Sequence, residues 1–116
     1  MDQDRKARLE AGGINIHGAL ERFMGNEAML EHYLQKFLTE KSYAGLEAAI
    51  TAGDREAAGI AAHSLKSVCG TLGCVAMQAL VLRQEECMRA GNWDEAVRMM
   101  PDIAASYRKI CAVLHE

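Results

Sequence analysis

The segment DREAAGIAAHSLKSVCGTLG, residues 54–73, predicts one long amphipathic helix. Asp54 can cap its first turn, because a carboxylate accepts hydrogen bonds from the N–H groups that lack partners there. Gly73 can end it, since glycine adopts the left-handed conformation common at helix ends. At about 100° per residue, the apolar side chains form one stripe opposite His63. They are Ala58, Ala61, Ala62, Leu65, Val68, Cys69 and Leu72. We therefore expect this stripe to be buried and His63 to face solvent.

Glycine and asparagine residues divide the rest of the chain into further helices. We expect a short helix over residues 15–24 and a longer one over residues 26–52, because the Asn that begins each segment can cap a first turn. The longer helix is expected to be looser near residues 41–43. A further helix is expected over residues 75–90, between two glycine breaks.

A last helix is expected after Asn92. Its apolar residues are spaced alternately four and three apart, which is the pattern of a helix-bundle seam. Pro101 removes a backbone donor and crowds the preceding turn, so we expect either a kink there or a new first turn. The seam residues are Ala96, Met100, Ile103, Tyr107, Ile110 and Leu114.

The composition favours one all-α domain. The chain has 116 residues, of which 50% are hydrophobic and only one is proline, and a chain of this length forms one ordinary domain. Short loops make consecutive helices antiparallel neighbours. We therefore expect an antiparallel up-down four-helix bundle with a short extra N-terminal helix, formed by residues 13–116. Residues 1–12 are expected to be a polar leader.

Charge and hydropathy limit the classes of partner. The formal net charge of −3 gives no reason to expect a nucleic-acid partner. No apolar run reaches the roughly 18 residues of a membrane span, and the N-terminal residues contain no apolar signal region. We therefore expect a cytoplasmic protein without membrane insertion, and a monomer.

The four cysteines leave one alternative function open. They show neither a CxxC pair nor zinc-finger spacing, so we expect reduced thiols and no bound metal. A cysteine-based metal or redox protein would instead contain stoichiometric zinc or iron after purification.

The face around His63 is built mostly of small residues. Gly59, Ser67 and Gly70 lie near it on the helix, and the one large neighbour is Lys66, a cation. Glycine inside a helix is unfavourable by about 1 kcal/mol relative to alanine, so two on one exposed stripe require a reason. One such reason is that small residues let another protein approach the imidazole closely. An exposed imidazole can act as a nucleophile, since much of it is neutral near neutral pH. An ordinary surface histidine beside closely packed helices would give the same pattern.

The sequence AHSLKSVCGTLG, residues 62–73, resembles the signature of histidine-phosphotransfer (HPt) domains, which has an H-x-L-K-[G/S] core. Gly70 and Gly73 match small positions of the family, and Ser67 stands where many members have glycine. The rhythm of residues 13–38 and the breaks at Gly53-Asp54 and Gly91-Asn92 are also similar. The resemblance covers nearly the whole chain from residue 13 to residue 114.

The resemblance implies a phosphocarrier rather than an enzyme with its own kinase activity. It implies that His63 accepts the phosphoryl group, that Lys66 supports it, and that the partners are receiver (response regulator) domains and a sensor histidine kinase. Mg²⁺ is then expected on the receiver, and no cofactor on this chain. Some members have a polar side chain on the next helix that touches the imidazole, and Glu85 or Gln84 is the candidate here. The charge pattern of residues 83–86, by contrast, predicts a solvated helix face.

A docking module that shares the fold but is never phosphorylated remains the alternative function. Incubation with a phosphorylated receiver separates the two, because only a phosphocarrier takes up acid-labile phosphate. Phe23, Met24 and Leu30 are candidates for a docking patch near His63, or simply close the end of the bundle.

Overall fold

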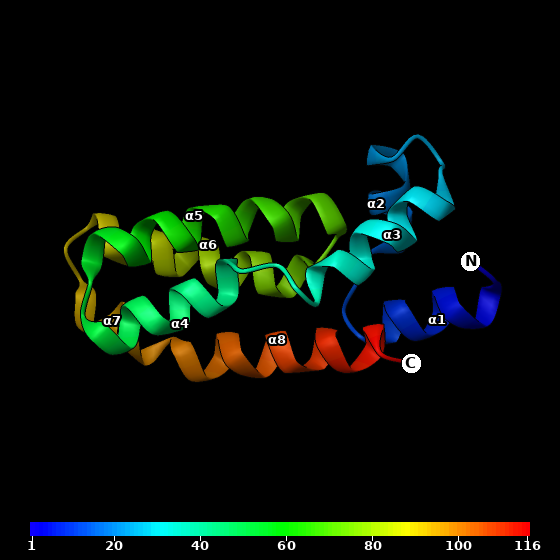
Figure 1. Ribbon diagram of the computed structural model, residues 1–116. Helices are drawn as coiled ribbons and strands as arrows, with labels where there is room; N and C mark the ends of the chain where they lie inside the picture. The colour runs from blue at the N-terminus through cyan, green and yellow to red at the C-terminus, as the bar shows by residue number, and fades with distance from the viewer.

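The computed structural model describes residues 1–116 as eight α-helices (Figure 1). The molecule is elongated, with extents of 44 × 24 × 19 Å, and it contains no strand beyond one isolated bridge. None of its helices combines the length and the hydropathy needed to cross a membrane. The helices are α1 (Gln3–Ala11), α2 (Ile16–Arg22), α3 (Glu27–Phe37), α4 (Ser42–Ala52), α5 (Arg55–Leu72), α6 (Val75–Arg89), α7 (Trp93–Arg98) and α8 (Met100–Leu114).

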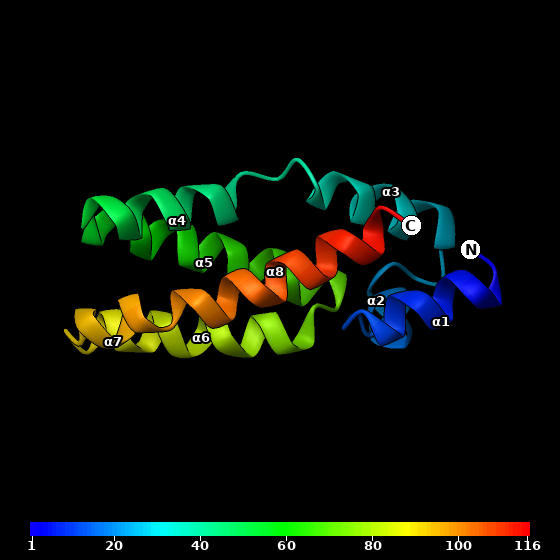
Figure 2. The same ribbon diagram turned by 90° about the horizontal axis from the view of Figure 1, so that it is seen from below.

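Helices α4, α5, α6 and α8 lie side by side along the long axis (Figures 1 and 2). Helix α5 packs against both α4 and α6, and α6 packs against α8. The rings of Tyr43 on α4 and Tyr107 on α8 stack with centroids 3.8 Å apart, which brings the first and last of the four together. The prediction of an all-helical fold is confirmed.

Helix α5 has the two faces expected from its sequence. Asp54 caps it, because its side chain accepts a hydrogen bond from the Ala57 N–H at 3.1 Å. Gly73 ends it in the left-handed conformation, with φ of 81°. The buried residues on its inner face are Ala58, Ala62, Leu65, Cys69 and Leu72. Packing of this stripe fixes how α5 is rotated about its own axis, and hence which residues face solvent.

The C-terminal end of α5 is also tied to the segment before α2. The Asn15 N–H donates to the Gly73 carbonyl oxygen at 2.8 Å. A side chain at residue 73 would place its Cβ 2.6 Å from the Asn15 carbonyl oxygen, so only glycine allows this approach. Asn15 also caps α2 by accepting from the Gly18 N–H. One short segment therefore fixes the start of α2 against the end of α5.

Two of the expected helices are divided in the structure. The helix expected over residues 26–52 is interrupted at residues 38–41 and becomes α3 and α4. The interruption overlaps the looser stretch predicted at residues 41–43 only at residue 41. The last helix is divided into α7 and α8, and Pro101 lies in the first turn of α8. Proline is tolerated there because N–H groups of a first turn have no intrahelical partner. Of the two outcomes expected at Pro101, the structure shows the new first turn.

Residues 1–12, expected to be a polar leader, form helix α1 and pack against the rest of the chain. Asp2 caps the helix, and the Leu9 side chain is fully buried in the core. Arg5 donates to the carbonyl oxygen of Val113 at 3.2 Å and pairs with Glu31 at 2.8 Å. Helix α1 therefore covers the end of the molecule where α8 finishes (Figure 1).

Replacement of Leu9 tests whether α1 is part of the cooperative fold. Because Leu9 is fully buried, Leu9→Ala is expected to lower the free energy of unfolding by about 2–4 kcal/mol, as for other buried leucines. Arg8→Ala is the control, since Arg8 is exposed on the same helix and should change stability by less than about 0.5 kcal/mol. Urea unfolding followed by circular dichroism measures both. Equal stability of the two variants would show that α1 is not part of the cooperative unit.

Candidate functional site

His63 lies in the middle of α5, on the face opposite the buried stripe. Its side chain is 67% exposed, which confirms the solvent-facing position predicted from the helical pattern. The ring is nevertheless held in place from one side. Its Nδ1 atom lies 3.0 Å from Oε2 of Glu85, which projects from the neighbouring helix α6.

Three nitrogen-containing side chains surround the carboxylate of Glu85. Besides His63 at Oε2, Lys66 donates to Oε1 at 2.5 Å, and a guanidinium nitrogen of Arg89 lies 3.6 Å from the same Oε1. The Glu85 side chain is only 7% exposed. We refer to His63, Lys66, Glu85 and Arg89 as the Glu85 cluster.

The environment of Glu85 determines which nitrogen of His63 carries the proton in the neutral ring. Burial opposes ionisation of Glu85, but hydrogen bonds from Lys66 and His63 outweigh it and hold the pKa of the carboxyl below its usual range. Glu85 is therefore ionised at neutral pH and can only accept hydrogen bonds. Nδ1 of His63 must then carry the proton. In the neutral ring this leaves the lone pair on Nε2, the nitrogen that does not contact Glu85.

Of the two polar candidates on α6, the structure places Glu85 against the imidazole. Gln84 points into the core instead, where it is fully buried and donates to the Ala96 carbonyl oxygen at 2.9 Å. The expectation that residues 83–86 form a solvated face is wrong for these two positions. Glu85 is buried because its charge is paired there, an arrangement that local charge pattern does not reveal.

The small residues near His63 differ in their surroundings. A Cβ at Gly59 would meet nothing within 4 Å, so the helix surface there is open. Ser67 is exposed, and its hydroxyl donates to the His63 carbonyl oxygen at 3.2 Å. Gly70 is not open, because a Cβ there would lie 2.6 Å from Nε2 of Gln78. The open surface predicted around the imidazole is therefore present at Gly59 and Ser67, and at Gly70 it is occupied by a side chain of α6.

A hollow of about 480 Å³ lies on the Gly59 side of His63. Arg55 and Arg89 both line it, and the exposed side chain of Ile60 lies at its edge. Sequence reasoning did not single out these three residues. For Arg89, the available signal was its spacing of four from Glu85, because residues four apart are neighbours on a helix.

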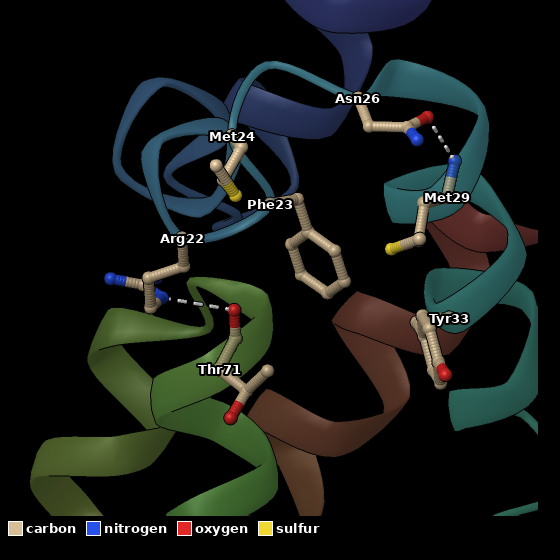
Figure 3. A pocket seen from close by; sticks show the side chains of 7 residues that line it. All are labelled: Arg22, Phe23, Met24, Asn26, Met29, Tyr33 and Thr71. Carbon is tan, nitrogen blue, oxygen red and sulfur yellow. Dashed lines mark hydrogen bonds between the residues drawn. The ribbon is translucent and has the colours of Figure 1, made fainter.

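An apolar groove of about 530 Å³ lies between α2, the start of α3 and the end of α5 (Figure 3). The Phe23 ring lies inside it, 5.6 Å from the ring of Tyr33, and Met29 lies on the α3 side. Arg22 bridges the groove's edge to α5 by donating to the Thr71 carbonyl oxygen at 3.0 Å. Of the three candidate docking residues, Met24 is 93% exposed and Phe23 lines the groove, but Leu30 is fully buried and closes the core.

The groove and His63 share one side of α5. Ser67 and Thr71 follow His63 at successive four-residue steps, and Thr71 lines the groove. Their hydroxyls donate to the carbonyl oxygens of His63 and Ser67. A protein that contacts His63 with an ordinary interface would therefore also reach the groove.

The cysteines were the candidates for a metal or redox function. All four cysteines are free, and Cys69 and Cys74 are buried. No group of three or more His, Cys, Asp or Glu side chains is placed to hold a metal ion.

The family model of the Hpt domain matches residues 28–113. The chain belongs to the Hpt domain family. A search of curated proteins and a search of solved structures gave no match. The whole Glu85 cluster lies within the matched residues of this Hpt domain, whereas α1 and α2 precede them. Membership of the family implies a role in histidine phosphotransfer within a two-component phosphorelay, with receiver and kinase partners.

The contrast between Gly59 and Gly70 gives a prediction about stability. Gly59→Ala is expected to raise the free energy of unfolding by about 0.5–1 kcal/mol, because alanine favours a helix and its Cβ would enter open space. Gly70→Ala is expected to gain less, since its Cβ would displace the Gln78 amide. Urea unfolding of both variants measures the difference. Equal gains at the two positions would contradict the observed surroundings of Gly70.

The lowered pKa of Glu85 gives a prediction about acid stability. A carboxyl whose pKa is lower in the folded state stabilises the fold above its ordinary pKa, 4.5 for Glu, and this contribution is lost as pH falls through the folded-state value. The stability difference between the wild type and Glu85→Gln is therefore expected to shrink as pH falls below 4.5. Unfolding measured from pH 7 to pH 3 tests this. A difference that stays constant over the range would contradict it.

Proposed function

We propose that this Hpt domain carries a phosphoryl group on Nε2 of His63 and exchanges it with an aspartate of receiver domains. The observation that carries the proposal is the hydrogen bond of Glu85, which holds Nδ1 protonated and leaves the exposed Nε2 as the nucleophile. A sensor histidine kinase is the proposed source of phosphate, since the Hpt domain carries the group without a kinase activity of its own.

The proposed transfer replaces a P–O bond of the receiver with an N–P bond on His63. The Nε2 lone pair attacks the phosphorus of an aspartyl phosphate, the N–P bond forms, and the P–O bond to the aspartate breaks. The aspartate leaves as a carboxylate, and no proton moves. The ring, which keeps its Nδ1 proton, becomes positively charged. The Glu85 carboxylate lies against that proton and offsets the new positive charge. It therefore stabilises the positively charged, phosphorylated ring relative to the free ring.

Lys66 is the proposed contact for the phosphoryl group. It follows His63 by three residues, so both side chains lie on the same face of α5. An ammonium group is a strong donor to phosphate oxygens. In the present structure Lys66 is engaged with Glu85, so contact with phosphate requires it to turn away from that carboxylate.

The surface around His63 is the proposed contact area for the receiver. The openness at Gly59 and Ser67 allows a close approach, and the apolar groove gives the partner a place to bury side chains.

We propose that the receiver supplies the Mg²⁺ used in the exchange. We further propose that the chain acts in the cytoplasm as a monomer, and that α4, α5, α6 and α8 constitute an antiparallel up-down bundle.

A docking module without phosphotransfer is the second candidate. The apolar groove beside Met24 favours it, because such a groove binds a partner whether or not His63 reacts.

Replacement of His63 distinguishes the two candidates. His63→Gln is expected to abolish transfer from a panel of receiver domains charged with acetyl phosphate. Melting should change little, because the ring is mostly exposed and a glutamine amide can still donate to Glu85. His17→Gln is the matched control, since His17 is also exposed and also contacts a carboxylate, Glu21, at 3.1 Å. Acid-labile phosphate, measured by intact-protein mass spectrometry, is the readout. Equal uptake by His63→Gln and wild type would contradict the assignment of His63, and binding without uptake in the wild type would favour the docking module.

A further inference from the structure

We infer that Arg89 is a positioning residue for this transfer, which takes over the Glu85 carboxylate when Lys66 turns to the phosphoryl group on His63. The inference rests on the proposed function. It concerns a residue that does not itself touch the reacting atoms but maintains the hydrogen bond that keeps the imidazole oriented.

In the present structure, one oxygen of Glu85 is shared unequally between two cations. Lys66 Nζ lies 2.5 Å from Oε1 and Arg89 Nη1 lies 3.6 Å from it, while Oε2 is occupied by His63. The Lys66 side chain is 22% exposed and that of Arg89 is 63% exposed. Lys66 therefore forms the hydrogen bond, and Arg89 remains in the solvated part of the cluster without forming one.

Phosphorylation of His63 changes what the cluster must neutralise. A phosphoryl group brings two negative charges next to the nearly buried carboxylate of Glu85. Lys66 follows His63 by one helical turn and is the nearest cation on α5. If it bonds the phosphoryl group, Oε1 of Glu85 loses its only hydrogen bond. A buried carboxylate oxygen without a partner is strongly unfavourable, so Glu85 would hold the imidazole of His63 less firmly.

Arg89 is placed to prevent this. It follows Glu85 by four residues on α6 and makes no other ion pair. Shortening the 3.6 Å separation by about 0.8 Å would give a charge-assisted hydrogen bond of normal length. Its guanidinium offers several donors in a planar fork, so it can replace the ammonium group as a donor to the carboxylate.

The other charged residues of the adjoining hollow are less suited to this role. Arg55 lies over the ring of Trp93, 5.4 Å from its centroid, and it is two turns before His63 on α5. Glu56 lines the same hollow but is an anion. Arg89 is therefore the cation that combines closeness to Oε1 with freedom to move.

The first test measures the rate of phosphoryl transfer from a receiver charged with acetyl phosphate. Arg89→Gln is expected to slow uptake by about two- to five-fold, the range that corresponds to a partly exposed ion pair. Arg89→Lys should restore most of the rate. Arg83→Gln is the matched control on the same helix, because Arg83 is exposed and lies outside the cluster, and it should leave the rate unchanged.

A double-mutant comparison tests whether Arg89 acts through Glu85. In a Glu85→Gln background there is no carboxylate to neutralise, so adding Arg89→Gln should have no further effect on the rate. A second readout is the exchange of the His63 Nδ1 proton with water, followed by NMR. Arg89→Gln should accelerate this exchange in the phosphorylated protein and leave it unchanged in the unphosphorylated protein, where Lys66 holds Glu85.

Each result supports or overturns the inference. If Arg89→Gln transfers phosphate as fast as Arg83→Gln, or if its defect persists in the Glu85→Gln background, Arg89 does not act through Glu85 and the inference is wrong. Circular dichroism of each variant confirms that it is folded. Failure of the proposed function has a different signature, since the wild type itself would then take up no phosphate on His63, and the inference would fall with it.

Discussion

An ionised carboxylate that is nearly buried connects the two helices on which the site depends. Glu85 accepts hydrogen bonds from His63 and Lys66 of α5 while it projects from α6. This arrangement requires α5 and α6 to keep one rotation and one register, because a shift of either helix by one residue would turn these side chains away from each other. A partner removed from such a buried charge leaves it uncompensated. The contact therefore constrains the packing of the bundle and the protonation of the imidazole together.

That register is set by groups far from the imidazole. The inner stripe of α5 buries small and aliphatic side chains, and small residues such as Ala58 and Ala62 allow neighbouring helices to approach closely. At the end of α5, Gly73 accepts a hydrogen bond from Asn15 at a distance that excludes any side chain. The position of His63 toward solvent follows from these buried contacts. The same contacts place α2 and its groove on the side of α5 where a partner of His63 would bind.

The features predicted correctly from sequence are those encoded by local pattern. The caps Asn15, Asn26 and Asp54 each accept from an N–H group of their own first turn, as expected, and the period of α5 was sufficient to place His63 outside. Contacts between helices are different, because no local signal records them. Gln84 and Glu85 are adjacent and both can hydrogen-bond an imidazole, so sequence could not decide which one meets it. The close approach of Gln78 to Gly70 likewise depends on the spacing of α5 and α6. Helix α1 was missed because it is polar apart from one buried leucine, Leu9.

The charges of the site fit the proposed exchange of a phosphoryl group at His63. The Glu85 cluster contains two basic side chains, Lys66 and Arg89, against one carboxylate, which is an excess of one positive charge. The proposed transfer would add a dianionic phosphoryl group and one positive charge on the ring, which together would cancel that excess positive charge. In the unphosphorylated cluster His63 occupies Oε2 of Glu85, and both cations lie beside Oε1, where only Lys66 forms a hydrogen bond. Glu85 thus keeps Lys66 close to the imidazole. Under the proposed function, the free energy needed to move Lys66 away from Glu85 would depend on whether Arg89 can replace it.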